Sequence, residues 1–212
     1  MNYTREQIEA AVKAKGYAYF DGAKDYDVNI IGVRNSSTGN DVTNLFDDTM
    51  TVSFKVGGVW QFHQWQATTD PGTKGVKEFH NAGGVARLVP GQYRGSHQLG
   101  LHQGKYQALK QKANVKVYRD ANKDATYDEN KIDEGIFGIN IHKAGADSTY
   151  VENWSEGCQV FKRERDFNQF LEFCKLASGI HGNSFTYTLI ESGDFIAADK
   201  AKGDVKKAAK KK

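Results

Sequence analysis

Two residues that can act together as nucleophile and base lie sixteen positions apart in this sequence, at His142 and Cys158. A neighbouring imidazole can take the proton of a thiol, and the thiolate that results attacks carbonyl carbon. Gly157 directly precedes the cysteine, so the backbone can approach a substrate closely and its N–H groups can face a developing oxyanion. Spacing alone leaves a second interpretation equally open, in which a buried cysteine and a surface histidine are unrelated.

Strand ends must position this pair. Residues 136–142 alternate apolar and polar side chains, so His142 is expected on the polar face at the end of a strand, and residues 158–161 are expected to form a short strand that begins at the cysteine. Neighbouring strands lie about 4.8 Å apart, so side chains at adjacent strand ends can reach hydrogen-bond distance. Ser155 and Asn140 are the candidates for a third group that orients the imidazole.

The remaining patterns predict one mixed, strand-dominated domain with flanking helices. Hydrophobic residues make up 39% of the 212 residues and aromatic residues 12%, which indicates a folded protein, and 22 glycines against 2 prolines indicate many turns. Cys174 falls on the apolar face of the last predicted helix, so we expect it in the core. Helices are expected at 4–15, with a capping box, at 105–112 and at 167–177, with Asp166 as its cap. Further strands are expected at 28–33, 51–56, 59–65, 115–118 and 185–191, and at 86–93 with an interruption at Pro90.

The interval from His142 to residues 155–158, Ser-Glu-Gly-Cys, resembles the catalytic signature of the L,D-transpeptidase family. In that family a strand-end histidine precedes Ser/Thr-His-Gly-Cys by a comparable interval. Residues 67–72 and 89–93 are similar to the family's Thr/Gly-rich strand and its Pro-Gly-aromatic turn, so the resemblance extends over about 50–191. It implies an α+β fold with a mixed, sandwich-like sheet and the cysteine at a cleft. The chain is most similar to phage-encoded members.

The resemblance also implies a chemistry. Cys158 would attack the amide carbonyl that joins an L-centre to a D-amino acid in a peptidoglycan stem peptide, and His142 would protonate the leaving amine. Backbone N–H groups at Gly157 and the cysteine would stabilise the oxyanion. Water then gives hydrolysis and an amine gives cross-linking. The leading expectation is a phage cysteine peptidase that degrades the host wall, with endolysin or L,D-carboxypeptidase activity. The alternatives are a transpeptidase that modifies the wall and an inactive structural or virion protein that keeps the fold.

Two positions depart from the family pattern. Glu156 stands where the family has a histidine, and Val160 stands where it has an arginine that helps to hold the substrate. Substrate binding is therefore expected to use other cations, with Lys143, Lys162 and Arg163 as candidates.

Residues 94–135 have no counterpart in minimal family members and are expected to be an insertion. His97 and His102 lie five positions apart within it, which does not suit one helix face, and no HExxH pattern accompanies them, so zinc is weakly supported. We expect a polar loop near the cleft, where these two histidines and Asn140 line the substrate site.

An acidic stretch at 120–133 resembles a calcium-binding loop. Positions 1, 3, 5, 7 and 9 of an EF-hand-like loop are occupied by Asp120, Asn122, Asp124, Thr126 and Asp128. The turn glycine and the bidentate glutamate of that motif are replaced, and a solvated acidic turn is an equally weighted alternative. The proposed chemistry requires no other cofactor.

Positive charge is concentrated at the C-terminus. Residues 197–212 carry seven lysines and two aspartates, a net +5, which leaves about −2 for residues 1–196 out of the total of +3. The folded part therefore offers no basic face for nucleic acid. We expect 1–196 to form a single catalytic domain, and 197–212 to be a disordered, removable tail that contacts anionic polymers. Residues 1–20 lack a signal-peptide pattern and no apolar run spans a membrane, so the protein is expected to be made in the cytoplasm and to reach the wall after lysis or as virion cargo.

Overall fold

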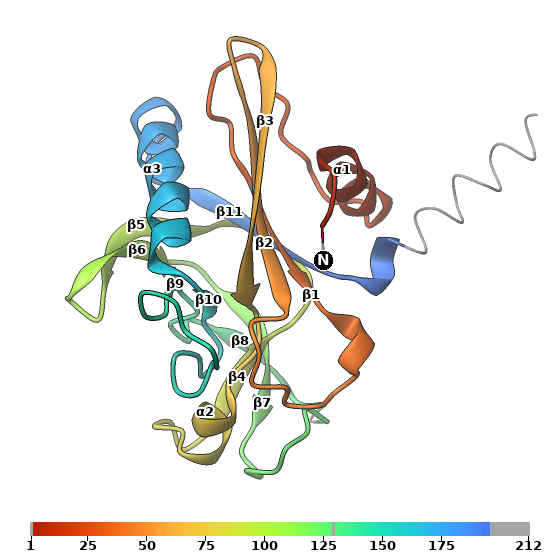
Figure 1. Cartoon of the computed structure of the whole chain (residues 1–212), viewed down its shortest axis with the longest axis vertical. Helices are drawn as coiled ribbons and strands as arrows, with labels where there is room; N and C mark the ends of the chain where they lie inside the picture. The colour runs from red at the N-terminus through yellow and green to blue at the C-terminus, as the bar shows by residue number, and fades with distance from the viewer. Residues whose placement is uncertain (1, 129, 196–212) are drawn as a thin grey trace, which may run out of the picture.

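A closed barrel of eight strands dominates the computed structural model, which describes residues 2–128 and 130–195 (Figure 1). The barrel order is β1-β11-β5-β6-β9-β10-β3-β2, and a three-stranded sheet of order β4-β7-β8 lies at one end of it. The expected mixed α+β class, rich in strands with few helices, is confirmed. The tail predicted at 197–212 lies outside the described residues. In chain order the elements are α1 (Arg5–Ala14), β1 (Asn29–Arg34), the 3-10 helix η1 (Ser36–Thr38), β2 (Asp48–Val56), β3 (Val59–Thr68), α2 (Thr73–Lys77), β4 (Val85–Leu88), β5 (Gly91–His102), β6 (Tyr106–Gln111), β7 (Val115–Asp120), β8 (Ile132–Gly135), β9 (Ile141–Lys143), β10 (Gln159–Phe161), α3 (Glu164–His181) and β11 (Phe185–Glu191).

The first helix forms as its sequence predicts. The Thr4 hydroxyl accepts a hydrogen bond from the Gln7 N–H at 3.2 Å, and the Gln7 side chain accepts one from the Thr4 N–H at 2.9 Å. This reciprocal capping box satisfies two donors that a helix start leaves unpaired. Ile8 and Val12 are fully buried and pack against β1 residues on the outside of the barrel.

The segment predicted as a helix at 105–112 is instead strand β6, and that prediction is wrong. It pairs antiparallel with β5, and the turn between the two strands places Gln103 and Gly104 at φ values of 49° and 72°. Leu109 is fully buried and pairs with Ile141 of β9. The local sequence is compatible with a helix or a strand. Pairing with β5 on one side and β9 on the other stabilises the strand.

The long helix α3 covers the barrel with its apolar face. It begins at Glu164, three residues before the predicted start, and its N-cap is Arg163 without a side-chain cap, so Asp166 lies in the first turn and does not cap it. Cys174 is fully buried in the main core, which confirms its predicted position. In Figure 1, α3 and α1 lie on opposite sides of the β2–β3 hairpin. No helix of the described residues combines the length and apolarity needed to cross a membrane.

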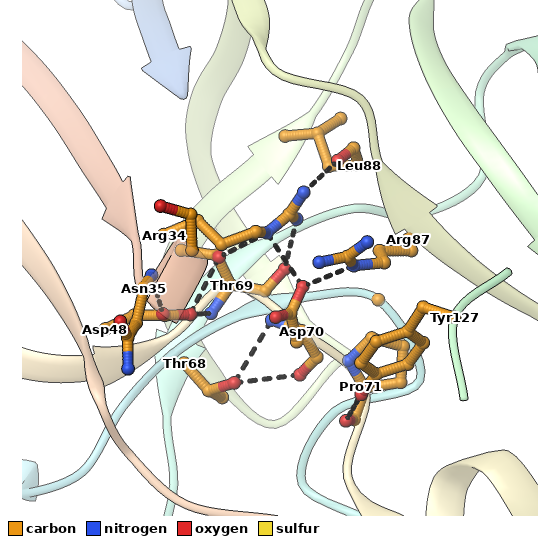
Figure 2. A network of polar contacts seen from close by, with 12 residues as sticks. Arg34, Asn35, Asp48, Thr68, Thr69, Asp70, Pro71, Arg87, Leu88 and Tyr127 are labelled. Atoms are coloured by element: carbon orange, nitrogen blue, oxygen red, sulfur yellow. Dashed lines mark hydrogen bonds and ion pairs between the residues drawn. The ribbon is translucent and has the colours of Figure 1, made fainter. Parts of the chain in front are cut away.

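A buried network of charges joins the barrel to the small sheet (Figure 2). The Arg34 guanidinium, at the end of β1, donates to the Leu88 carbonyl of β4 at 2.9 Å and forms an ion pair with Asp70 at 2.8 Å. Asp48 accepts hydrogen bonds from the Thr69 N–H and hydroxyl at 2.6 and 2.8 Å. Because Arg34 is only 1% exposed, its charge must be matched inside the protein, and this requirement holds the turn after β3 against β4.

Strand β4, which the charge network holds in place, also contacts the segment that precedes Cys158. Its Arg87 donates to Asp70 at 2.8 Å, and the next residue toward the N-terminus, Ala86, donates its N–H to the Glu156 carbonyl at 3.0 Å. Strand β4 therefore contacts both the charge network and the loop that precedes Cys158.

The Asp48 carboxyl is expected to make stability depend on pH. Burial, and then the charge of Asp70, raise its pKa. The folded protein therefore holds a proton that the unfolded chain has released above about pH 4, and this contribution to stability is lost as the pH rises through the folded-state pKa. Asp48→Asn should remove that slope. Urea unfolding at pH 4.5 and pH 8 should show wild type losing more stability than the variant between the two values.

The exposed carboxylate of Asp41 provides the control, since Asp41→Asn should keep the wild-type slope. A difference in stability between wild type and Asp48→Asn that is the same at both pH values would contradict the prediction.

Candidate active site

Cys158 and His142 line one cleft of about 970 Å³. Strands β9 and β10 run parallel with Val160 opposite His142, which places Cys158 immediately before β10 on the neighbouring strand. The expected pairing of the two strand ends is confirmed, although only Ile141–Lys143 of the predicted strand 136–142 is regular strand. The cleft is lined by His80, Ala86, His102, Gln103, Lys105, Tyr106, Phe137, Gly138, Ile139, Asn140, His142, Asn153, Trp154, Glu156 and Cys158.

Hydrogen bonds at one ring nitrogen fix the state of His142. Its Nδ1 lies 2.8 Å from the Lys143 carbonyl oxygen and 3.2 Å from the Tyr106 hydroxyl. A carbonyl can only accept, so we assign the imidazole proton to Nδ1. Nε2 makes no hydrogen bond within the described residues, and its lone pair is therefore available as a base.

The imidazole of His102 packs against that of His142. The rings of His102 and His142 stack with centroids 4.1 Å apart and planes inclined by 22°. The Asn140 amide donates to Nδ1 of His102 at 3.1 Å, which leaves the His102 proton on Nε2. Asn140, a candidate to orient His142, therefore acts on it only through His102. The group that orients His142 directly is the Lys143 carbonyl, with Tyr106 beside it.

The resting thiol and imidazole are both neutral. Burial raises the pKa of Cys158 to about 11, with the Asn140 backbone N–H lowering it and the charge of Glu156 raising it further. Burial, and then the proximity of His102, lower the pKa of His142 to about 3. The sequence suggested a thiolate held ready by the base. The structure corrects this, because a charged pair is penalised at this depth and the thiol donates to the Gly138 carbonyl at 3.3 Å instead.

Ser155 shapes the loop that carries Cys158. Its hydroxyl donates to the Cys158 carbonyl at 2.8 Å and accepts the Gly157 N–H at 3.1 Å. The expectation that Ser155 orients His142 is therefore corrected. The Gly157 N–H is occupied, whereas the Cys158 N–H makes no hydrogen bond within the described chain and is the available donor for an oxyanion.

Gly157 is required by its surroundings. Its φ of 139° lies in the region that favours glycine, and an added Cβ would stand 2.1 Å from the Ala86 carbonyl oxygen. The glycine thus lets the loop lie directly on β4, which places Cys158 at the cleft.

His97 lies behind the cleft and not in it. The side chain is fully buried, Nε2 lies 2.9 Å from the Ile139 carbonyl oxygen and Nδ1 lies 2.8 Å from the Ser96 hydroxyl. Burial lowers its pKa to about 4. The expectation that His97 contacts substrate is therefore corrected, and it supports the segment before β9 from within the core.

The cations expected to replace the family's arginine lie elsewhere. Lys143 forms an ion pair with Glu164, and Arg163 and Lys162 form ion pairs with Asp147 at 3.2 and 3.9 Å. None of these three cations is among the described residues that line the cleft. The expectation that Lys143 and Arg163 bind substrate is corrected, because carboxylates of the loop and of α3 hold them away from the cysteine.

Sequence reasoning assigned no role in the cleft to five of the residues that line it. Tyr106 and Lys105 lie at the β5–β6 turn, where a helix had been expected, so the error in secondary structure hid them. Trp154 is 42% exposed at the cleft. His80 and Glu156 form a pair with Nδ1 and Oε1 2.5 Å apart. The only available signal in the sequence was the position of Glu156 two residues before Cys158.

The side chains of the acidic loop hydrogen bond within the loop. Asp124 accepts from the Thr126 N–H and hydroxyl at 2.8 and 2.7 Å, and the Asn122 amide donates to Asp124 at 3.0 Å. The Asn122 N–H donates to Asp120 at 3.3 Å. Among the described residues there is no group of three or more His, Cys, Asp or Glu side chains placed to hold a metal ion together. Calcium binding by Asp120, Asn122, Asp124, Thr126 and Asp128 stays a prediction.

If this loop binds Ca²⁺, the ion should raise the melting temperature. A ligand at a hundred times its Kd adds about 2.7 kcal/mol, or roughly 5–10 °C for a chain of this size. Chelator should reverse the shift and Asp124→Ala should abolish it, as differential scanning calorimetry can measure. Identical melting curves with Ca²⁺ and with chelator would rule the ion out and leave the solvated acidic turn.

The fold and site together define a strand-rich α+β protein with a cysteine and a histidine in one cleft. Comparison with protein-family models, with curated proteins and with solved structures finds no match to this chain. The chemistry of the cleft therefore carries the functional argument.

Proposed function

We propose that this protein is a cysteine peptidase that cleaves the bond between an L-centre and a D-amino acid in peptidoglycan stem peptides. The observation that carries the proposal is that Cys158 and His142, whose Nε2 makes no hydrogen bond among the described residues, line the same cleft from neighbouring strands. The resemblance of residues 142–158 to the L,D-transpeptidase signature supports this substrate class. It also supports the mixed, sandwich-like fold of that family as a more specific description of the barrel.

The first half-reaction forms a thioester. The Cys158 Sγ–H proton passes to His142 Nε2 as sulfur attacks the amide carbonyl carbon, so no charged thiolate needs to be held in the resting cleft. The Cys158 N–H stabilises the oxyanion of the tetrahedral intermediate. When the carbon–nitrogen bond breaks, Nε2 returns the proton to the leaving amine, and the imidazole is neutral again.

Water completes the reaction. His142 takes a proton from water as the oxygen attacks the thioester, and the carbon–sulfur bond breaks with return of that proton to Sγ. The Lys143 carbonyl and Tyr106 keep the imidazole oriented through both halves. An amine in place of water would give a cross-link instead. We favour hydrolysis, with the protein encoded by a phage and acting on the host wall after release or as part of the virion.

Digestion of purified sacculi tests the proposal. The soluble products are separated and identified by mass spectrometry, with Cys158→Ala as the matched control. Hydrolysis gives shortened stems and free amino acid or peptide, whereas transpeptidation gives new cross-links. Unchanged sacculi with the wild-type protein would contradict the proposal and favour a structural protein that keeps the fold.

A further inference from the structure

The cleft around Cys158 has one cation and one anion along its described walls besides its histidines. Lys105 is the one lysine or arginine among the lining residues, and Glu156 is the one carboxylate. Lys105 is exposed at the β5–β6 turn and makes no ion pair among the described residues. Glu156 is paired with His80.

The two charges lie at opposite ends of the reacting pair. The backbone N–H of Lys105 donates to the His102 carbonyl at 2.9 Å, and the charge of the Lys105 side chain lowers the pKa of His102. The His102 ring in turn stacks on His142. Lys105 therefore belongs to the imidazole end. Glu156 belongs to the thiol end, because it is two residues from Cys158 and its charge raises the pKa of that thiol.

This polarity orients a substrate. In the proposed reaction the leaving amine takes its proton from His142, so the released residue lies at the imidazole end. In an amino acid the amine and the carboxylate are separated by a single carbon atom, which places that carboxylate toward Lys105. The opposite orientation would bring the carboxylate toward Glu156, where like charges repel.

We propose that Lys105 is the specificity residue of this cleft: its ammonium binds the free α-carboxylate of the residue that leaves. The protein then acts as a carboxypeptidase on a C-terminal D-amino acid, and internal bonds, which lack that carboxylate, are poor substrates. This inference rests on the proposed function and assigns a cation to the role of the arginine that Val160 replaces in the family pattern.

Two peptides that differ only at the C-terminus test the assignment, N-acetyl-L-Lys-D-Ala and its C-terminal amide. Wild type should prefer the acid. Lys105→Gln should lower kcat/KM for the acid by about tenfold relative to kcat/KM for the amide, the effect of one charged hydrogen bond. Lys110→Gln is the matched control, because Lys110 also acts electrostatically on His102 but is not among the lining residues. Equal loss on both peptides, or no loss on either, would overturn the inference.

Binding separates this inference from the proposed function. In the Cys158→Ala protein, calorimetry should show tighter binding of the acid than of the amide, and adding Lys105→Gln should remove the difference. If wild type cleaves neither peptide but this preference holds, the proposed peptidase fails and the carboxylate site stands. If acid and amide bind equally with Lys105 present, the carboxylate site is wrong whatever the activity.

Discussion

Cys158→Ala should eliminate turnover of stem peptides while leaving the protein folded. The thiol supplies the bond to the acyl group, and alanine offers no nucleophile in its place. Folding should survive, because Cys158 is partly exposed at the cleft and its thiol donates only to the Gly138 carbonyl. Product release from a defined peptide and circular dichroism measure the two effects.

Alkylation provides a test that needs no substrate. Cys158 should react with iodoacetamide faster than Cys174, because Cys174 is fully buried on the inner face of α3 and burial raises its pKa well above the ordinary value. Below about pH 11, the pKa of Cys158, its rate without help from a base should rise about tenfold per pH unit with the thiolate fraction. Inertness of Cys158 in the native protein, or cleavage by Cys158→Ala, would reject the catalytic interpretation.

His142→Ala should lower kcat by about 10²–10⁴-fold, the usual contribution of a positioned general base. Alkylation of Cys158 near neutral pH should slow as well, since the thiol would lose the group that takes its proton. The matched control is His97→Asn, at a histidine that does not line the cleft: activity per folded molecule should fall much less.

The pH dependence of kcat tests the same role of His142. Burial and His102 hold the pKa of His142 near 3, so the neutral imidazole that must accept the proton persists well below pH 6. Activity should therefore stay nearly constant from about pH 5 to 8 and fall only as the pH approaches 3. A steep loss of kcat between pH 7 and 5 would show that an imidazole with an ordinary pKa limits the reaction.

Patterns of local sequence determined much of the fold. The capping residues Thr4 and Gln7, the alternation along the β2–β3 hairpin and the apolar face of α3 around Cys174 each specify their element, because the interactions that define them lie within a few residues. The same holds for β11, whose bounds match the predicted 185–191. The prediction for the β6 segment was wrong, because its pairing with β5 and β9 outweighed a weak local preference for helix.

The sequence by itself also singled out the proposed nucleophile and base. The types and the spacing of His142 and Cys158, with glycine before the cysteine, singled out two strand ends that the structure does bring to one cleft. The predicted third group and the substrate cations were not specified in this way. Contacts between side chains distant in sequence have no local pattern, so Tyr106, Lys105 and the His102 stack could not be read from composition or periodicity.

Only the tertiary structure decided the protonation state of the pair and the polarity of the cleft. A pKa depends on burial and on charges that many elements bring together, so the shifts of Cys158 and His142 follow from packing and not from the residues beside them in the chain. Likewise, the ion pairs that withdraw Lys143 and Arg163 and leave Lys105 at the cleft exist only in the folded chain. The sequence supplied the candidate groups, and long-range packing determined which of them line the cleft.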